Sequence, residues 1–436
     1  MENQDRGSAR TSRRQFISVA GLAATAVLTL ATSSTASAAG PTAPNPGSRV
    51  GDPAEAQAVQ RVAETLLNSG VPGLAFAIVK PDEKNRKASV TTTYHYGHAD
   101  VENGVRVTPR TQFEIASETK TFTAALLAKL IARGEVGLDD LASKYSDGNP
   151  LPKGSSGEEI TLRQLVTHRS GLSDDPPNLS AGCADPTQSC VDEKAKYTRD
   201  MLWEGLRAPG ALEFAPGSHW LYSDFGFGLL GTLMADKIIP GQEKPPFAAD
   251  RRQGRIADPL GMMGTVIETK ATDLAVPYYL DGTRAPLWNN TGAIAGGGGL
   301  VSTAEDMSIW AATTLGYGNN PLKPVLTSML EQIDTQAPEN PAFGMGMAWQ
   351  LQPPTPNFPQ RFAKKNGDSS GSNCITLLVP DSGWSITILA NGGNAAMIDP
   401  AAVNLMHDLV PRRPIFGSST GSSSGSDVGF QTGSFG

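Results

Sequence analysis

The chain has 436 residues, of which 39% are apolar and 18% charged, and its formal net charge is −7. These values are ordinary for a soluble globular protein with a large core, and they exclude wholesale disorder and a bundle of membrane helices. The acidic balance, which no basic cluster offsets, argues against nucleic acid or an anionic membrane as the main partner.

Segment 1–39 has the pattern of a twin-arginine signal peptide. Arg13 and Arg14 precede a short apolar run from Ile17 to Leu30, and small residues then lead to Ala36-Ser37-Ala38-Ala39. The apolar run is too short to span a bilayer well, so we expect no stable membrane anchor. This pattern predicts export by the twin-arginine route to the periplasm or the cell exterior.

Composition predicts three further parts. Residues 40–52 are rich in Pro and Gly, which indicates a flexible mature N-terminus. Residues 53–412 carry the periodic apolar pattern of a folded domain. Residues 413–436 are rich in Gly and Ser and are expected to form a disordered tail.

The spacing of apolar residues predicts helices through the middle of the domain and strands near both of its ends. Helices are predicted over 53–68, 117–132, 161–168, 197–207, 224–237, 304–315 and about 399–409. Strands are predicted over 71–80, 88–96, 344–351, 361–364, 372–379 and 384–390. This order favours an α+β fold, with one antiparallel sheet built from both chain ends, flanking helices, an all-helical lobe and a site in the cleft between them.

One pair of residues suggests nucleophilic chemistry. Ser117 lies three residues before Lys120 at the start of a predicted helix, so the hydroxyl and the amine share one face. A serine hydroxyl needs a neighbouring base to attack at neutral pH, and a desolvated lysine can serve. A serine and a lysine on the surface of an amphipathic helix would show the same spacing, so the pair needs support from the rest of the chain.

Three cysteines and five histidines leave little material for a metal site. Cys183 and Cys190 bracket a polar loop, and outside the cytoplasm we predict a disulfide between them, with two free thiols as the alternative. Cys374 lies in an apolar strand and is expected to be buried and inert. The doublet His95 and His98 lacks a third ligand, so we expect no metal and no cofactor.

Beyond the Ser117 pair, a series of motifs in chain order resembles the serine β-lactamase and penicillin-binding superfamily. The resemblance is to the branch with class C β-lactamases, D-alanyl-D-alanine carboxypeptidases and related esterases. The matching segments are 96–140, 162–172, 220–231, 297–309, 344–350, 365–367 and 374–391. An ordered set across most of residues 53–410 is far more specific than the serine–lysine spacing alone.

The resemblance implies a role for each of four residues. Ser117 would attack a carbonyl and become acylated, with Lys120 as its base or as a charge that favours the alkoxide. Tyr222 would share proton transfer, provided that the neighbouring ammonium groups of Lys120 and Lys365 lower its pKa. Lys365 would attract a substrate carboxylate. By contrast, His168 is interpreted as a structural residue that closes a turn.

The resemblance also implies a substrate-binding set with two departures from the usual pattern. Gly367 would let substrate approach the backbone, and the N–H groups of Ser117 and Asp368 would form an oxyanion hole. Asp224 stands where the lactamases usually have Asn, so it would hold Lys120 charged but contact a substrate amide poorly. Asn366 replaces the more usual Thr, and the acidic Asp368 beside the site would discourage anionic substrates.

Three functions remain open at this point. The first is an exported serine hydrolase on D-amino-acid peptides, of the D-alanyl-D-alanine carboxypeptidase or endopeptidase type or related to β-lactamases. The second is an esterase or acyl-transferase on substrates unrelated to the cell wall, which Asp224 favours. The third is a penicillin-binding sensor with little turnover. In each case the expected partner is a small molecule or peptide, such as a peptidoglycan-like peptide, a β-lactam or an ester.

Overall fold

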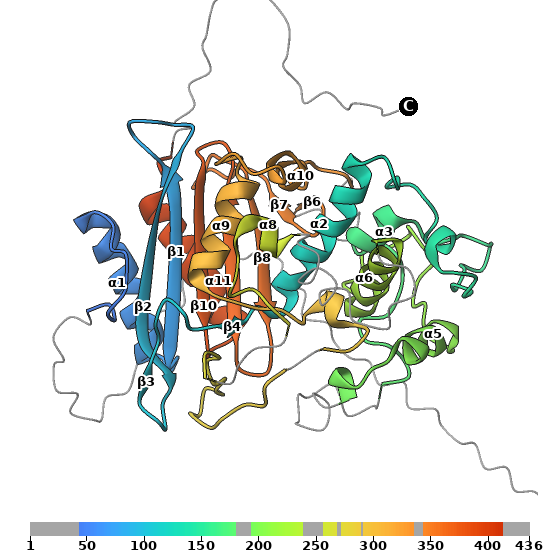
Figure 1. Cartoon of the computed structure of the whole chain (residues 1–436), viewed down its shortest axis with the longest axis horizontal. Coiled ribbons are helices and arrows are strands. Elements are labelled where there is room, and N and C mark those ends of the chain that lie inside the picture. The colour runs from blue at the N-terminus through green and yellow to red at the C-terminus, as the bar shows by residue number, and fades with distance from the viewer. Residues whose placement is uncertain are drawn as a thin grey trace, which may run out of the picture. The chain divides into compact units, whose positions relative to one another are not determined.

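The computed structural model describes residues 43–179, 193–238, 256–267, 272–288, 291–334 and 343–412 (Figure 1). The predicted signal peptide, the cysteines Cys183 and Cys190 and the predicted tail lie outside these ranges. The described residues belong to one compact unit.

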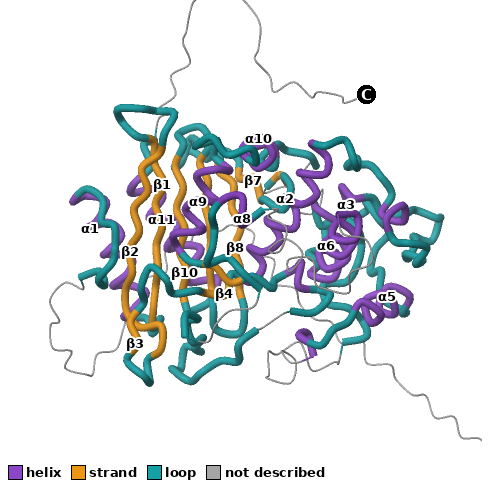
Figure 2. The backbone as a smooth tube through the Cα atoms, in the orientation of Figure 1, coloured by secondary structure: helices purple, strands orange, loops and turns teal. Residues whose placement is uncertain are grey.

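An antiparallel sheet with strand order β3-β2-β1-β10-β9-β8-β7-β6 forms the centre of the structure (Figure 2). Strand β1 pairs with β2 on one side and with β10 on the other, so the N-terminal hairpin and the C-terminal meander share one sheet. This confirms the predicted sheet built from both chain ends. The strands are β1 Gly73–Pro81, β2 Ser89–Asp100, β3 Val105–Arg106, β6 Gly344–Met345, β7 Gln350–Gln352, β8 Phe362–Asp368, β9 Asn373–Val379 and β10 Trp384–Ala390. A separate pair consists of β4 Phe113–Glu114 and β5 Val301–Ser302.

The helices begin at residues that favour helix starts. Asp52 caps the first helix by accepting from the N–H groups of Ala54 and Glu55, and Thr303 caps α9 by accepting from Asp306. Among the described helices, none is both long and apolar enough to cross a membrane. The helices are α1 Pro53–Asn68, α2 Thr119–Ala132, α3 Leu162–Val166, α5 Arg199–Arg207, α6 Asp224–Ile238, α8 Ala257–Leu260, α9 Ala304–Thr314, α10 Lys323–Ser328 and α11 Ala395–Leu409.

The sheet separates two apolar cores because successive side chains of a strand point to opposite faces. On β1, Phe76 packs with α1 and α11, whereas its neighbour Ala77 belongs to the larger core around α2 and α9. Helix α2 is buried on almost all sides, and its buried residues include Thr119, Lys120 and Thr123 beside the apolar ones. Its N-terminal end, on the larger-core side of the sheet, therefore brings the candidate nucleophile against β8.

Three predicted boundaries differ from the structure. Segment 344–351 is two short strands, because Ala348 adopts a left-handed backbone with φ of 64° between them. Strand β8 continues past Lys364 to Asp368, so the Lys365-Asn366-Gly367 motif lies inside the strand. Helix α11 begins at Ala395 and passes through Pro400, because Asn394 supplies an N-cap one turn before the proline.

Candidate active site

Ser117 lies on a 3₁₀ turn, Ala116–Glu118, that joins β4 to α2. Ala116 has φ of 39°, a left-handed conformation that is unfavourable for a residue with a Cβ atom. Its neighbour Ile115 holds the turn in place, because its N–H donates to Leu300 O at 3.0 Å and its carbonyl accepts from Cys374 Sγ at 3.2 Å. Such strain persists only where surrounding contacts impose it, and functional sites are the usual place.

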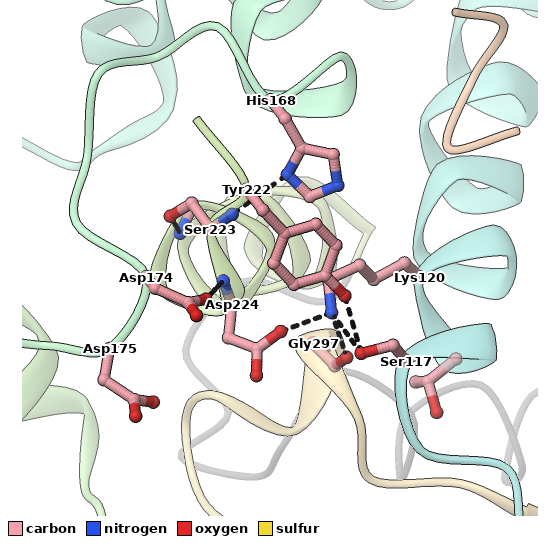
Figure 3. A network of polar contacts seen from close by, with 12 residues as sticks. Ser117, Lys120, His168, Asp174, Asp175, Tyr222, Ser223, Asp224 and Gly297 are labelled. Carbon is pink, nitrogen blue, oxygen red and sulfur yellow. Dashed lines mark hydrogen bonds and ion pairs between the residues drawn. The ribbon is translucent and has the colours of Figure 1, made fainter. Parts of the chain in front are cut away.

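Lys120 is fully buried, and its ammonium group has three acceptors. Nζ donates to Ser117 Oγ at 3.0 Å, to the Gly297 carbonyl at 2.6 Å and to the Asp224 carboxylate (Figure 3). Burial is the largest single effect and would lower the pKa of Lys120, but the charges and hydrogen bonds of Asp224 and Tyr222 together outweigh it and raise the pKa. Asp224 therefore keeps Lys120 in its charged form, as the sequence predicts.

Asp224 begins α6, and two neighbours fix this helix end. Ser223 Oγ accepts from Gly226 N at 2.7 Å and donates to Ser173 O at 2.7 Å, while Asp174 Oδ1 accepts from Asp224 N at 3.2 Å. The positive charge of Lys120 lowers the pKa of Asp224 against the effect of burial. Burial and the Asp224 charge together raise the pKa of Asp174 to about 7.

Tyr222 is the second donor to the candidate nucleophile, with its hydroxyl 2.6 Å from Ser117 Oγ. Its ring stacks on His168 with 4.4 Å between centroids, and Lys120 Nζ lies 4.6 Å from the ring centroid. Burial raises the pKa of Tyr222 to about 12. The Lys120 charge acts to lower this pKa, and the Asp224 charge acts to raise it. The lowered pKa that is the condition for Tyr222 to act as a base is therefore not met, because burial and the Asp224 charge outweigh the effect of the Lys120 ammonium group.

His168 is buried, has φ of 61°, and accepts from Ser223 N at 3.1 Å through Nδ1. Burial and the two nearby lysines hold its pKa well below the usual value. A neutral imidazole that orients Ser223 and supports the Tyr222 ring agrees with the predicted structural role.

Lys365 is the second buried lysine of the site. Its Nζ lies 5.6 Å from the Tyr222 ring centroid and donates to Asn366 O at 2.7 Å. Burial lowers the pKa of Lys365 to about 7, and repulsion from Lys120 adds to this effect. Gly367 lies on the same face of β8. A Cβ atom there would come within 2.1 Å of Ile115 O, so this glycine lets the serine turn itself approach the strand.

The structure does not bring the side chains of Asn366 and Asp368 to Ser117. Alternation along β8 turns both toward α11, where Asn366 Nδ2 lies 3.2 Å from Asp399 Oδ2 and Asp368 Oδ2 accepts from Ala395 N at 3.4 Å. The expectation that the Asp368 carboxylate discourages anionic substrates is therefore wrong. Only the backbone of these two residues remains available on the serine side.

Sequence reasoning missed the Gly297 carbonyl, the Ser223 cap and the stacking of His168 on Tyr222. The Ser223 cap had a signal, because a serine directly before an apolar helical run is a common N-cap. Within the described ranges, no cluster of three or more His, Cys, Asp or Glu side chains could hold a metal ion. Cys374 is buried, and burial keeps its thiol pKa well above the usual value, which agrees with the expected inert cysteine.

The arrangement directs two hydrogen-bond donors, one of them the Lys120 ammonium group, at one serine oxygen in a largely buried environment. Such donors stabilise negative charge on that oxygen and on atoms bonded to it. A lysine and a tyrosine directed at one serine oxygen are the arrangement expected of a serine hydrolase.

Comparison with known proteins places the chain within that class. A family model described as "Beta-lactamase" matches residues 56–409, so the chain belongs to the β-lactamase family of serine hydrolases. It is 31% identical over 256 residues to the D-alanyl-D-alanine-carboxypeptidase/endopeptidase AmpH of Escherichia coli (strain K12), a match that covers 58% of this chain and 60% of that protein.

Two further proteins are similar over longer stretches. A putative D-alanyl-D-alanine carboxypeptidase of Escherichia coli O157:H7 is 26% identical over 379 residues, covering 77% of this chain and 81% of that protein. The crystal structure of a β-lactamase/D-alanine carboxypeptidase from Pseudomonas syringae superposes with a TM-score of 0.65 at 22% identity, over 82% of this chain and 100% of that one. This last similarity supports the fold, and with it the predicted α+β architecture.

Proposed function

We propose that the protein is an exported serine hydrolase that works through a covalent acyl-enzyme on Ser117 and resembles D-alanyl-D-alanine carboxypeptidases in its substrate. The observation that carries this proposal is the pair of hydrogen bonds from Tyr222 and Lys120 to Ser117 Oγ. Both donors favour negative charge on the serine oxygen, which develops as it attacks a carbonyl carbon.

Lys120 acts as a fixed charge in this mechanism. Its three protons are already directed at Ser117, Asp224 and Gly297, so no lone pair is available to accept the serine proton. Its raised pKa keeps it charged throughout the neutral range. Lys120 therefore stabilises the alkoxide and the tetrahedral intermediate rather than serving as the base.

Tyr222 relays the proton. When substrate binds, the phenol O–H turns from Ser117 Oγ toward the leaving group. As Ser117 Oγ bonds to the carbonyl carbon, its proton then passes to the phenol oxygen of Tyr222, and the phenol proton passes to the leaving amine or alcohol. A concerted relay of this kind needs no stable phenolate, which fits a tyrosine with a pKa of about 12. In deacylation, water attacks the ester carbon, and the relay runs in reverse to restore the serine hydroxyl.

The backbone N–H groups of Ser117 and Asp368 would bind the oxyanion. Support comes from the close packing of the serine turn on β8, where Gly367 meets Ile115 O. Lys365, on the same face of that strand, would attract the free carboxylate at the C-terminus of a peptide substrate. The names of the two Escherichia coli relatives point to the same substrate class.

A second candidate, an esterase, is favoured by one observation. The Asp224 carboxylate is paired with Lys120, so it offers no N–H donor to a substrate amide. The lack of that donor should weaken the binding of an amide or a β-lactam more than the binding of an ester. The experiment below therefore includes both types of substrate.

The test uses the purified full chain with a fluorescent penicillin, a p-nitrophenyl ester and an acetylated D-alanyl-D-alanine peptide. We expect hydrolysis of the peptide, with a covalent adduct on Ser117 detected by mass spectrometry of trapped samples. Ser117→Ala should abolish both, and Tyr222→Phe should slow turnover by about 10²–10⁴-fold, the usual contribution of a positioned proton donor. Ser69→Ala, at an exposed serine after α1, is the matched control.

Each alternative outcome has a separate meaning. Turnover of the ester alone would replace the peptidase by the esterase. Stable labelling by penicillin without turnover of any substrate would indicate a sensor. Activity that survives Ser117→Ala would overturn the acyl-enzyme mechanism.

Export is part of the proposal and rests on the pattern of Arg13 and Arg14 before the apolar run. In a bacterium with a twin-arginine system, the processed protein should begin at or near Gly40, as determined by N-terminal sequencing. Replacement of both arginines by lysine should leave the unprocessed chain inside the cell. Processing that continues unchanged in that variant would contradict the proposed route.

A further inference from the structure

Glu118, the residue after the candidate nucleophile, is buried in a way that the mechanism above does not explain. Its side chain is 0% exposed, and the donors within reach of its carboxyl group are neutral ones, the Thr376 hydroxyl and the Cys374 thiol. Burying a carboxyl group with so few donors is costly, and such groups in native proteins usually have a specific role.

The carboxyl group of Glu118 faces the sheet behind Ser117. Its nearest polar neighbours are the Thr376 hydroxyl and the Cys374 thiol, both on β9, and the ammonium group of Lys365 on β8. Lys365 and Thr376 are direct cross-strand partners, so their Cβ atoms lie about 5 Å apart on the same face of the sheet. The sheet register therefore places the buried carboxyl beside the buried lysine.

No carboxylate among the described residues forms an ion pair with Lys365 of the kind that Asp224 forms with Lys120. Its ammonium group donates to the Asn366 carbonyl, and Lys120 repels it. The groups that favour its charged form are Cys374, Glu118 and Asp224, of which Asp224 is already paired with Lys120. Asp399 and Lys364 lie on the α11 side of β8 with Asn366, not on this face.

We propose that Glu118 is the counter-charge of Lys365 and that the two share one proton. When the carboxylate of a substrate approaches Lys365, the proton of the Glu118 carboxyl group passes to the Lys365 amine, which leaves a carboxylate and an ammonium ion. The site would thereby gain a cation for an anionic substrate without taking a proton from solvent. This role rests on the proposed function of Lys365, and Glu118 acts through that lysine as a positioning residue.

Burial and the mutual attraction of the two groups support this proton exchange. The pKa of Glu118 is raised to about 7 by burial, and that of Lys365 is lowered to about 7. With both pKa values near neutrality, the neutral pair and the ion pair are close in free energy, so a nearby substrate charge can decide between them.

The first experiment compares kcat/KM for an acetylated D-alanyl-D-alanine peptide and for its C-terminal amide between pH 5.5 and 8.5. In Glu118→Gln we expect the preference for the acid over the amide to fall about tenfold at pH 7.5, because Lys365 loses about one pKa unit of support. The loss should appear in KM, and the preference should return at pH 5.5. Glu118→Asp, which keeps the charge, should retain part of the preference, and Thr376→Val is the control for repacking.

A second experiment does not depend on turnover. Calorimetry in two buffers of different protonation enthalpy measures the protons taken up when each peptide binds to Ser117→Ala. At pH 7, we expect Ser117→Ala to take up almost no protons when it binds the acid peptide. Ser117→Ala/Glu118→Gln should take up close to one proton when it binds the same peptide. Lys365→Met in the Ser117→Ala background should abolish the preference for the acid.

These readouts separate the two proposals. If the wild-type protein hydrolyses none of the substrates, the proposed function fails, but proton uptake still tests Glu118. If Glu118→Gln has the same pH profile as the wild type, Glu118 is only structural and the inference is overturned. If Glu118→Gln does not fold, uptake of a full proton by Ser117→Ala at pH 7 would overturn the inference instead.

Discussion

The two buried lysines of the site differ in their partners. Lys120 donates to a carboxylate, a carbonyl and a hydroxyl, and its pKa is raised. Lys365 donates only to the neighbouring carbonyl of Asn366 among its described contacts, and its pKa is lowered to about 7. The two side chains are almost equally buried. The difference between their pKa values therefore comes from their charged partners and not from the degree of burial.

This difference fits a division of labour. A lysine that must stabilise a serine alkoxide in every turnover benefits from a permanent counter-charge, which Asp224 supplies. A lysine that responds to an arriving substrate carboxylate benefits from a charge that forms only when it is needed.

The largest effect is expected when Lys120 loses its counter-charge. Asp224→Asn leaves the fully buried Lys120 ammonium group with no carboxylate, and should lower the free energy of unfolding by about 3 kcal/mol, as measured by urea denaturation. Lys120→Met should cost less, because the Asp224 side chain is 26% exposed and water can solvate its charge, whereas Lys120 is 0% exposed.

Two further variants test this prediction. Lys120→Met/Asp224→Asn removes both charges and should recover most of the stability that Asp224→Asn loses. Asp408→Asn, which breaks the exposed pair with Arg61, should change stability by less than about 1 kcal/mol. A loss in Asp224→Asn no greater than in Asp408→Asn would contradict the role of Asp224.

The second effect concerns the packing that brings the two lysines together. In Gly367→Ala, the new methyl group would meet Ile115 O at 2.1 Å, so the serine turn must move away from β8. We expect a stability loss of about 2 kcal/mol, typical of overpacking, and a larger fractional loss of activity because Ser117 moves with the turn.

The matched control for Gly367→Ala is Gly137→Ala. Gly137 has no positive φ, and the nearest atom to its added methyl group would be Asp140 Oδ2 at 3.6 Å, an ordinary contact. Equal stability and equal activity of the two variants would show that the serine turn tolerates displacement. That result would contradict the close packing as a cause of the site geometry.

The sequence predicted that four residues meet at the site, because each lies in a motif with a fixed place in the chain order. These residues are Ser117, Lys120, Tyr222 and Lys365. Spacing on a helix predicted the contact between Ser117 and Lys120, which the 3.0 Å distance confirms. The sheet from both chain ends could be predicted because its strands carry strong apolar patterns.

Other features depend on contacts that no local pattern encodes. The Gly297 carbonyl is a backbone group, so no side-chain signal points to its contact with Lys120. Glu118 would face solvent on an isolated helix, and only the packing of the serine turn against β9 buries it. By contrast, the placement of Asn366 and Asp368 could have been foreseen, because strand alternation turns them away from Lys365.

The third and smallest effect, per pH unit, is the contribution of Lys365 to pH-dependent stability. Its pKa is about 7 in the folded protein and about 10.4 in an unfolded chain. Between these values the unfolded chain binds more protons, so the term from Lys365 increases stability as pH rises, by about 1 kcal/mol per pH unit. The free energy of unfolding of the wild type minus that of Lys365→Met should therefore become more positive from pH 7 to pH 9.

Glu118 should enlarge that difference, because it titrates in the same window. In Lys365→Met the carboxyl group loses its nearby positive charge, so its pKa rises above 7, and the variant loses stability with rising pH as the buried carboxyl ionises. Urea denaturation at pH 7, 8 and 9 measures both effects, with Lys364→Met on the other face of β8 as the control for removing a lysine from this strand. Parallel pH dependence in the wild type and Lys365→Met would mean that Lys365 stays charged in the folded protein, and the contrast with Lys120 would then be lost.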